Sequence, residues 1–129
     1  MSPLPDRMRR TDERTMAATH RMTIEWVVPL GQTRPINNAL HSVAADVRPL
    51  PGCVGCSVST DIGNRGVVRY VEEWSSEEDL KSRLRSRAFV QIVTLMEDAK
   101  QPPHIEFELS RERRGFDYVE EVRGAEIHD

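Results

Sequence analysis

The sequence has no long apolar run, no excess of positive charge and only two cysteines. No stretch approaches the roughly 18 to 20 apolar residues that a membrane-spanning helix needs, and the first twenty residues lack the apolar stretch of a signal peptide. Lysine plus arginine number 18 against 21 aspartate plus glutamate, so the net charge of −3 provides no field that gathers nucleic-acid phosphates. We therefore expect a cytoplasmic protein that binds neither membrane nor nucleic acid.

Motifs for a phosphate, a metal or an activated nucleophile are also missing. The chain has no glycine-rich phosphate loop, no nucleophile elbow and no HExxH pattern. Cys53 and Cys56 have i, i+3 spacing, which on an extended strand places the two side chains on opposite faces. We therefore expect no disulfide or zinc site here, and we predict neither a metal nor a cofactor.

The length suits one domain with two extensions. The chain has 129 residues, of which 38% are apolar and 30% charged, with a mean hydropathy of −0.54. Residues 1–20 contain Pro3, Pro5 and no apolar periodicity, so we predict a flexible arm. Residues 21–110 form the predicted domain. Residues 111–129 form a C-terminal extension with a weak extended pattern, which could pack on another subunit.

Apolar periodicity predicts the element order β, α, β, β, α, β. The predicted elements are a strand at 22–28, a helix at 36–47, a hairpin of strands at 54–60 and 67–74, a helix after 74 and a strand at 104–109. Right-handed βαβ connections place both helices on one face of a four-stranded antiparallel sheet, the ferredoxin-like α+β arrangement. Because the opposite face keeps apolar side chains of one parity, we expect a second copy of the chain to cover it.

The second helix is predicted to begin at a capping box and to break within its length. Ser75 with Glu78 has the capping-box spacing. Leu80 and Leu84 lie at about 0° and 40° on a helical wheel, whereas a later apolar set centres at about 170°. That set consists of Phe89, Ile92, Val93 and Met96. One straight helix cannot bury both, so we predict a break at Ser86, which can cap a second piece reaching to about Asp98.

Three stretches within residues 22–109 carry a family resemblance. They are Pro51-Gly52 before the second strand, the segment from Tyr70 to Trp74, and residues 76–89 after it. Together they resemble the antibiotic biosynthesis monooxygenase domains, which are dimeric α+β barrels. The resemblance implies a homodimer and an oxidoreductase: a cofactor-independent monooxygenase acting on a small aromatic or quinol-type substrate. Two alternatives stay open: a non-catalytic small-molecule-binding or stress-associated protein, and a haem-binding or haem-degrading protein.

The same resemblance disfavours haem chemistry. Haem-degrading relatives carry an iron-ligating histidine on the second helix, and that position falls on Arg83, which cannot ligate ferric iron. Ligation would then need His41 or His104 by an unusual route. We interpret Arg83, Arg85 and Arg87 as a solvated helix face, because they lie within a helical pattern without interleaved aromatic residues.

Cofactor-free oxygenation needs an apolar pocket, an aromatic wall and a base that deprotonates the substrate. Tyr70, Glu72 and Trp74 share one parity on the third predicted strand, so they point to one face. Of the residues that surround substrate in polyketide-oxygenase relatives, Trp74 carries over. We predict Trp74 and Tyr70 as walls of a pocket between the split helix and the sheet, with Glu72 or His41 as the base; Trp26 is a further available aromatic.

Each of these residues has a structural alternative. Trp74 and Tyr70 could be packing aromatics, Glu72 could be an ion-paired residue, and His41 could be exposed at the boundary of the first helix. The sequence leaves both interpretations open.

Overall fold

The computed structural model describes residues 20–29, 31–61, 66–110 and 112–128, with the side chains of 125–128 excepted. The elements are β1 (His20–Val28), α2 (Thr33–Val47), β2 (Cys53–Asp61), β3 (Gly66–Trp74), α3 (Glu77–Arg85), the 3-10 turn η1 (Arg87–Phe89), α4 (Val90–Glu97), β4 (His104–Glu108), β5 (Arg113–Arg114) and α5 (Phe116–His128). The predicted arm at 1–20 lies outside the described residues except for His20, which begins β1.

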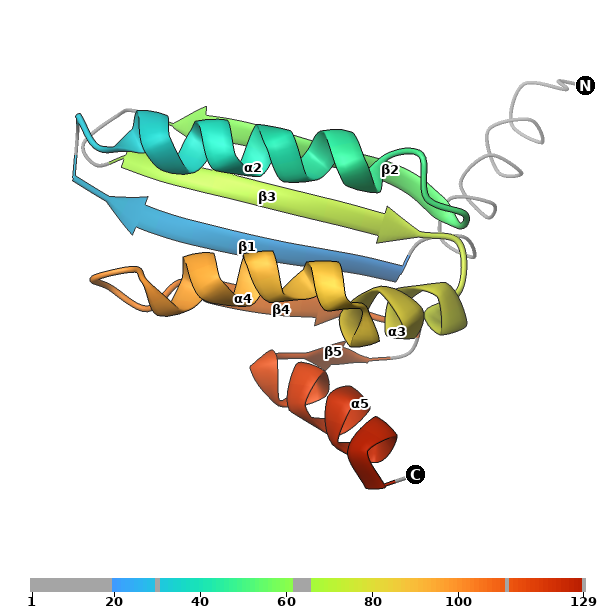
Figure 1. Ribbon diagram of the computed structural model, residues 1–129. Helices are drawn as coiled ribbons and strands as arrows, with labels where there is room; N and C mark the ends of the chain where they lie inside the picture. The colour runs from blue at the N-terminus through green and yellow to red at the C-terminus, as the bar shows by residue number, and fades with distance from the viewer. Residues whose placement is uncertain (1–19, 30, 62–65, 111, 129) are drawn as a thin grey trace, which may run out of the picture.

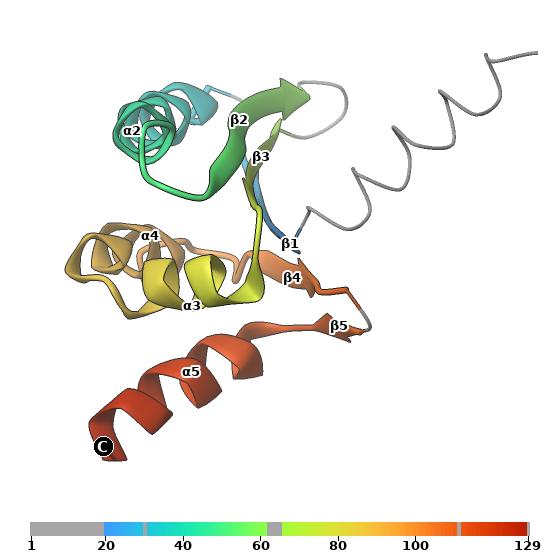
Figure 2. The same cartoon turned by 90° about the vertical axis from the view of Figure 1, so that its right-hand side faces the viewer.

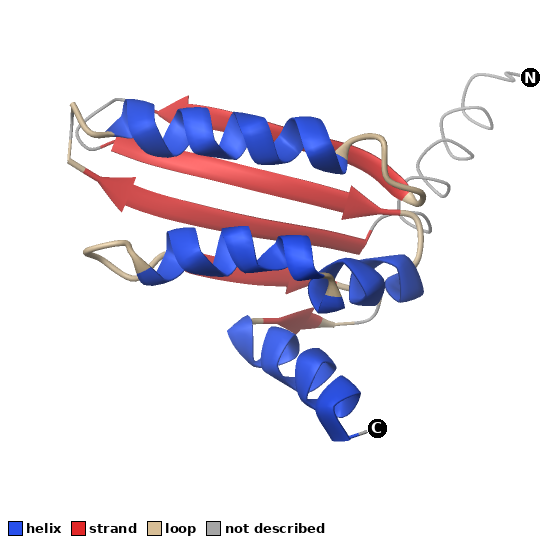
Figure 3. Ribbon diagram, viewed as in Figure 1, coloured by secondary structure: helices blue, strands red, loops and turns tan. Residues whose placement is uncertain are grey.

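The strands form one antiparallel sheet in the order β2-β3-β1-β4-β5 (Figure 1). All the described helices lie on one face of this sheet, as the view from the side shows (Figure 2). The ferredoxin-like α+β fold is therefore confirmed, and the predicted four strands gain a fifth, two-residue strand at the edge (Figure 3). No helix in the described ranges combines the length and the apolar character that crossing a membrane requires.

Alternating burial along the two central strands builds the core. On β1 the side chains of Met22, Ile24 and Trp26 face the helices and are buried, and on β3 Val68 and Tyr70 do the same. From the first helix, α2 contributes Leu40, Val43, Ala44 and Val47, as its periodicity predicts. Each large apolar side chain that is fully buried stabilises the fold by roughly 1.5–3 kcal/mol, so this single layer between sheet and helices holds the domain together.

The outer sheet face combines valines with ion pairs. Val67 and Val71 on β3 point outward, because Tyr70 and Trp74 face the helices. Beside them Arg21 contacts Glu73 at 2.8 Å and also reaches Glu108 on β4, and Arg69 pairs with Glu25. Such half-exposed pairs contribute at most about 1 kcal/mol each. Because these charged side chains lie beside the valines, the outer face is less apolar than the inner one.

The second helix breaks where the wheel analysis predicts. The hydroxyl of Ser86 accepts a hydrogen bond from the Phe89 amide at 3.3 Å, and η1 and α4 continue from there. The start of the helix differs by one residue: Ser76, not Ser75, is the N-cap, and its hydroxyl accepts from the amide of Asp79 at 3.1 Å. Ser75 lies before the helix, and its amide donates a hydrogen bond to the carbonyl of Gly52.

The predicted extended segment after Arg114 is wrong, because residues 116–128 form the helix α5. Tyr118, Val119 and Val122 are buried at helical spacing against the same subunit. The Tyr118 hydroxyl donates to Glu77 of α3 at 2.7 Å, and its ring lies 5.0 Å from that of Phe107. The extended pattern does not include Val119. With Val119 counted, the buried residues Tyr118, Val119 and Val122 have the i, i+1, i+4 spacing of a helix. Packing on a second subunit stays a prediction.

The backbone at Gly52 lies close to the side chain of Asp79. Even a small substitution at Gly52 should therefore destabilise the fold strongly. The φ of Gly52 is +86°, and an added Cβ would lie 2.8 Å from the Cβ of Asp79. We expect Gly52→Ala to lower the free energy of unfolding by about 3 kcal/mol, because backbone strain and overlap add. Gly31 is the matched control, since its φ is +89° with nothing within 4 Å. Gly31→Ala should cost about 1 kcal/mol; equal losses in chemical denaturation would contradict the packing argument.

Candidate functional site

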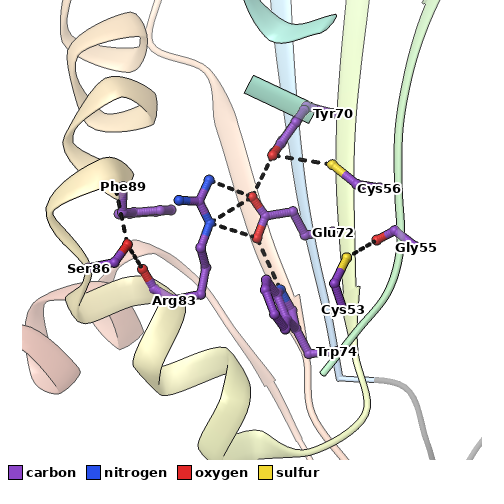
Figure 4. Close-up of polar contacts among 9 residues, drawn as sticks. All are labelled: Cys53, Gly55, Cys56, Tyr70, Glu72, Trp74, Arg83, Ser86 and Phe89. Atoms are coloured by element: carbon purple, nitrogen blue, oxygen red, sulfur yellow. Dashed lines mark hydrogen bonds and ion pairs between the residues drawn. The ribbon is translucent and has the colours of Figure 1, made fainter. Parts of the chain in front are cut away.

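A buried polar cluster lies on the helix-facing side of β3. Its centre is Glu72, which is fully buried, and Arg83 from α3, which is 4% exposed. The Arg83 Nη2 lies 2.8 Å from Oε2 of Glu72, and Nε lies 3.1 Å from both carboxylate oxygens. Figure 4 shows the guanidinium, the indole of Trp74 and the phenol of Tyr70 converging on this carboxylate.

Tyr70 and Trp74 complete the set of donors to Glu72. The Trp74 indole N–H donates to Oε1 at 3.0 Å, and the Tyr70 hydroxyl donates to Oε2 at 2.5 Å. Burying a carboxylate costs several kcal/mol unless a charge partner and hydrogen bonds replace its water. Three side chains supply that replacement here, so both oxygens of Glu72 are occupied within the fold. We name these four residues the Glu72 cluster.

Arg83 stays charged in this setting. Burial alone would lower the pKa of Arg83, but the hydrogen bonds and the negative charge of Glu72 outweigh that effect and leave the pKa above its usual value. The guanidinium also lies 5.2 Å from the ring centroid of Phe89, within the range of a cation–π contact. The charged guanidinium therefore ties α3 to β3 through the Glu72 carboxylate.

Cys56 extends the cluster along β2 without adding a base. Its thiol donates to the Tyr70 hydroxyl at 3.3 Å. Burial raises the pKa of Cys56 to about 11, and burial together with the charge of Glu72 raises the pKa of Tyr70 above its usual range. At neutral pH the thiol and the phenol are therefore protonated. They form a chain of donors that ends on Glu72.

The structure brings three of the four predicted site residues together. Tyr70, Glu72 and Trp74 share one face, as their parity predicts, and Glu72 is the ion-paired residue of the structural alternative. Trp74 is buried rather than at an open mouth. His41 is exposed on α2 and does not belong to the cluster.

The prediction that Arg83 is solvated is wrong, because Arg83 is buried. Its position lies three residues after Leu80 and one before Leu84, next to the apolar arc of α3, so the helix turns it toward the sheet. The signal that could have identified it is Glu72. A carboxylate on the buried parity of a strand needs a positive partner on the element packed against it.

The prediction that Cys53 and Cys56 lie on opposite faces is also wrong. Cys53 pairs with Trp74 and Cys56 with Glu72, both of which face the helices. The cause is a β-bulge between Cys53 and Gly55, which adds one residue and reverses the parity. Both cysteines are free, and no group of three or more histidine, cysteine or carboxylate ligands occurs within the described ranges.

Two hollows lie apart from the Glu72 cluster. The first, the α2–α4 groove, has a volume of about 720 Å³ and is lined by Ala39, Ser42, Val43, Asp46, Arg87, Ala88, Val90, Gln91, Thr94 and Leu95. The second, the Trp26 hollow, has a volume of about 530 Å³ and is lined by Trp26, Val27, Val28, Pro29, Gln32, Pro35, Ile36, Leu95, Asp98, Ala99, Lys100 and Gln101. Neither lining includes Tyr70, Glu72, Trp74 or His41.

The Trp26 hollow has the features of a small-molecule site. It lies between the end of β1, the start of α2 and the end of α4, and its volume falls within the roughly 300–1,000 Å³ typical of ligand pockets. Its wall is mostly apolar, and its polar side chains are Gln32, Asp98, Lys100 and Gln101. The indole N–H of Trp26 donates to the carbonyl of Leu95 at 3.3 Å, which fixes the aromatic wall. Sequence reasoning could not place this hollow, because three separate elements form it.

The Glu72–Arg83 pair predicts a strong energetic coupling. Arg83→Met leaves a buried carboxylate without its counter-charge, so we expect it to lower the free energy of unfolding by about 3–5 kcal/mol. In a double-mutant cycle with Glu72→Gln, the coupling energy should be about 2 kcal/mol. Arg85→Met is the matched control on the same helix, and it should change stability by no more than about 0.5 kcal/mol. Additive losses in urea titrations would show that the pair is not coupled.

The fold has counterparts among solved structures. A conserved protein of Methanosarcina mazei is 20% identical, with a TM-score of 0.62 over 72% of this chain and 93% of that chain. A Deinococcus radiodurans protein, whose description gives antibiotic biosynthesis monooxygenase as its candidate activity, is 16% identical, with a TM-score of 0.62 and the same coverage, 72% and 93%. A Bacteroides thetaiotaomicron protein of unknown function, described as a possible oxidoreductase, is 17% identical with a TM-score of 0.59 over 78% and 99%.

At these identities the solved structures show the fold alone. Among curated proteins, none matches this chain. The profile of the antibiotic biosynthesis monooxygenase family matches residues 19–95, which is more than half of the chain and runs from β1 to α4. The chain therefore belongs to the antibiotic biosynthesis monooxygenase family.

Proposed function

We propose that this protein is a cofactor-independent monooxygenase that holds a small aromatic or quinol-type substrate in the Trp26 hollow. Family membership supports the type of reaction. The observation that supports the place is the hollow itself, which combines an aromatic wall, an apolar lining and a few polar side chains at the volume of a small ligand. The place differs from the one expected around Trp74 and Tyr70, because the polar atoms of those residues are bound to Glu72.

In such a reaction the substrate supplies the electrons. Loss of a proton from a phenol, a quinol or an activated C–H group gives an anion, and the anion reduces O₂. One oxygen atom enters the product, and the other leaves as water with the two hydrogen atoms lost from the substrate. The protein must therefore bind the substrate, favour its anion and exclude bulk water from it.

The side chains of the Trp26 hollow can meet the first two of these requirements. The indole of Trp26 is almost fully buried, so it contributes only a small part of its surface to the wall that an aromatic ring would contact. The ammonium group of Lys100 favours the substrate anion, and the carboxylate of Asp98 is available to accept the proton. Gln32 and Gln101 offer amide N–H donors to substrate oxygens. In this proposal the Glu72 cluster is not the base, because deprotonation by Glu72 would first require its ion pair with Arg83 to open.

A non-catalytic small-molecule-binding protein is the second candidate, and one observation favours it. The most deeply buried carboxylate, Glu72, is fully engaged within the fold, whereas Asp98 and Lys100 are exposed at the hollow. A site of this kind can bind an aromatic ligand without promoting its ionisation. Oxygen uptake separates the two functions, because both bind the ligand but only the enzyme consumes O₂ with it.

We expect the purified protein to accelerate O₂ uptake by a substituted hydroquinone or naphthohydroquinone above the spontaneous rate. Lys100→Met should lower kcat/KM about tenfold or more, because it removes the charge that stabilises the anion. Lys81→Met is the control, since Lys81 lies on α3 outside both hollows. Calorimetric binding of the same compounds without any acceleration of O₂ uptake would favour the binding protein instead.

We propose a homodimer formed through the outer sheet face. The described helices leave this face uncovered, and Val67 and Val71 lie on it among cross-strand ion pairs. A second copy would cover these valines and pair its own charges with those of the first.

Sedimentation should therefore give a mass about twice the 14.8 kDa of one chain. Val71→Arg places a charge at the centre of the outer face, so we expect the dimer to dissociate to monomers. Val90→Arg is the matched control, because Val90 is 46% exposed on α4, on the helix side of the molecule. A monomeric wild-type protein at micromolar concentration would overturn the proposed dimer.

A further inference from the structure

The two hollows meet at a single side chain. Leu95 lines both the α2–α4 groove and the Trp26 hollow, and every other lining residue belongs to one of them. Leu95 is itself partly buried and packs against the core. A leucine side chain therefore stands between two spaces that are each large enough for a small ligand.

The same two helices line both hollows along one continuous seam. On α2, Ile36 borders the Trp26 hollow, and Ala39 and Val43 border the groove at the next helical turns. On the opposite side, the lining residues of α4 recur at the spacing of one helical face, from Val90 through Gln91 and Thr94 to Leu95. The hollows therefore lie end to end between α2 and α4 rather than at unrelated places.

The sheet holds Leu95 in place. The Leu95 carbonyl lies in the last turn of α4, where a helix leaves acceptors without an intrahelical partner. The indole N–H of Trp26 donates to this carbonyl at 3.3 Å, whereas the amide of Ala99 bonds to Met96. One residue of β1 thus forms the wall of the Trp26 hollow and also positions the residue that closes one end of it.

We infer that Leu95 sets the length of the aromatic ligand that the protein accepts. With leucine at this position, the Trp26 hollow takes compounds of one or two fused rings. A smaller side chain joins the hollow to the mostly apolar groove and admits a linear compound of three rings that runs along the seam. This inference rests on the proposed function in one respect, since it takes the Trp26 hollow as the ligand site.

Calorimetric binding of two unreactive probes tests the inference without relying on activity. The short probe is 2-naphthol, and the long probe is anthraquinone-2-sulfonate, which has three linear rings. Leu95→Ala should bind the long probe at least about tenfold more tightly than wild type, and its affinity for the short probe should change by less than about threefold. Leu95→Phe should bind the long probe no better than wild type.

Two controls separate the outcomes. Leu50→Ala removes an exposed leucine outside both hollows, so it should leave both affinities unchanged. Leu95→Val replaces Leu95→Ala if thermal melting shows that the alanine variant is unfolded. If wild type binds 2-naphthol but the smaller side chains bring no gain for the long probe, the role of Leu95 is overturned and the site stands. If no variant binds either probe, the Trp26 hollow is not a ligand site, and the proposed function fails with it.

Discussion

The ion pair between Glu72 and Arg83 is the interaction on which the helix layer depends. Glu72 belongs to the sheet and Arg83 to α3, and neither charge can be buried without the other. Satisfying the carboxylate fixes the distance and the rotation of α3 relative to β3. Because Ser86 breaks the helix directly after α3, the direction in which α4 leaves is set from this fixed point. The walls of both hollows include residues of α4, so their shape follows from a charge pair that does not line them.

This arrangement separates the groups that hold the fold from the groups that can meet a ligand. The phenol of Tyr70, the thiol of Cys56 and the indole of Trp74 are all engaged within the cluster, and the raised pKa values keep the phenol and the thiol protonated. The hollows offer mainly apolar walls with exposed polar side chains. Under the proposed function such a protein leaves the reducing power to the substrate and contributes the shape of the site and a nearby positive charge.

Sequence periodicity predicts the strands and the helix break because each depends on local patterns of burial. The two apolar arcs around Leu84 and Phe89 cannot share one straight helix, and this argument needs no tertiary information. Prediction from periodicity fails where one extra residue changes the alternation of side chains along a strand. The bulge at Cys53 reverses the parity on which the two-faces argument depends, and no side-chain pattern marks it.

Arg83 shows a second kind of limit: its burial follows from the buried parity of Glu72 on the preceding strand β3, and the pair becomes visible only when α3 is packed against that strand. The hollows are still harder to predict from the sequence, because they are the spaces left after β1, α2 and α4 have packed.

The distribution of polar links suggests which helix can adapt to a ligand. α3 is held by Arg83 toward the sheet and by α5, through Tyr118 to Glu77 and through Arg123 to the Leu84 carbonyl at 2.6 Å. Among the described residues, α4 has one side-chain hydrogen bond to the sheet, that of Trp26. A helix that is fixed at its start by η1 and near its end by one indole can shift more easily than its neighbour. The wall of both hollows that α4 provides is therefore held by fewer polar contacts than α3, and Leu95 is the α4 residue whose carbonyl accepts that hydrogen bond from the sheet.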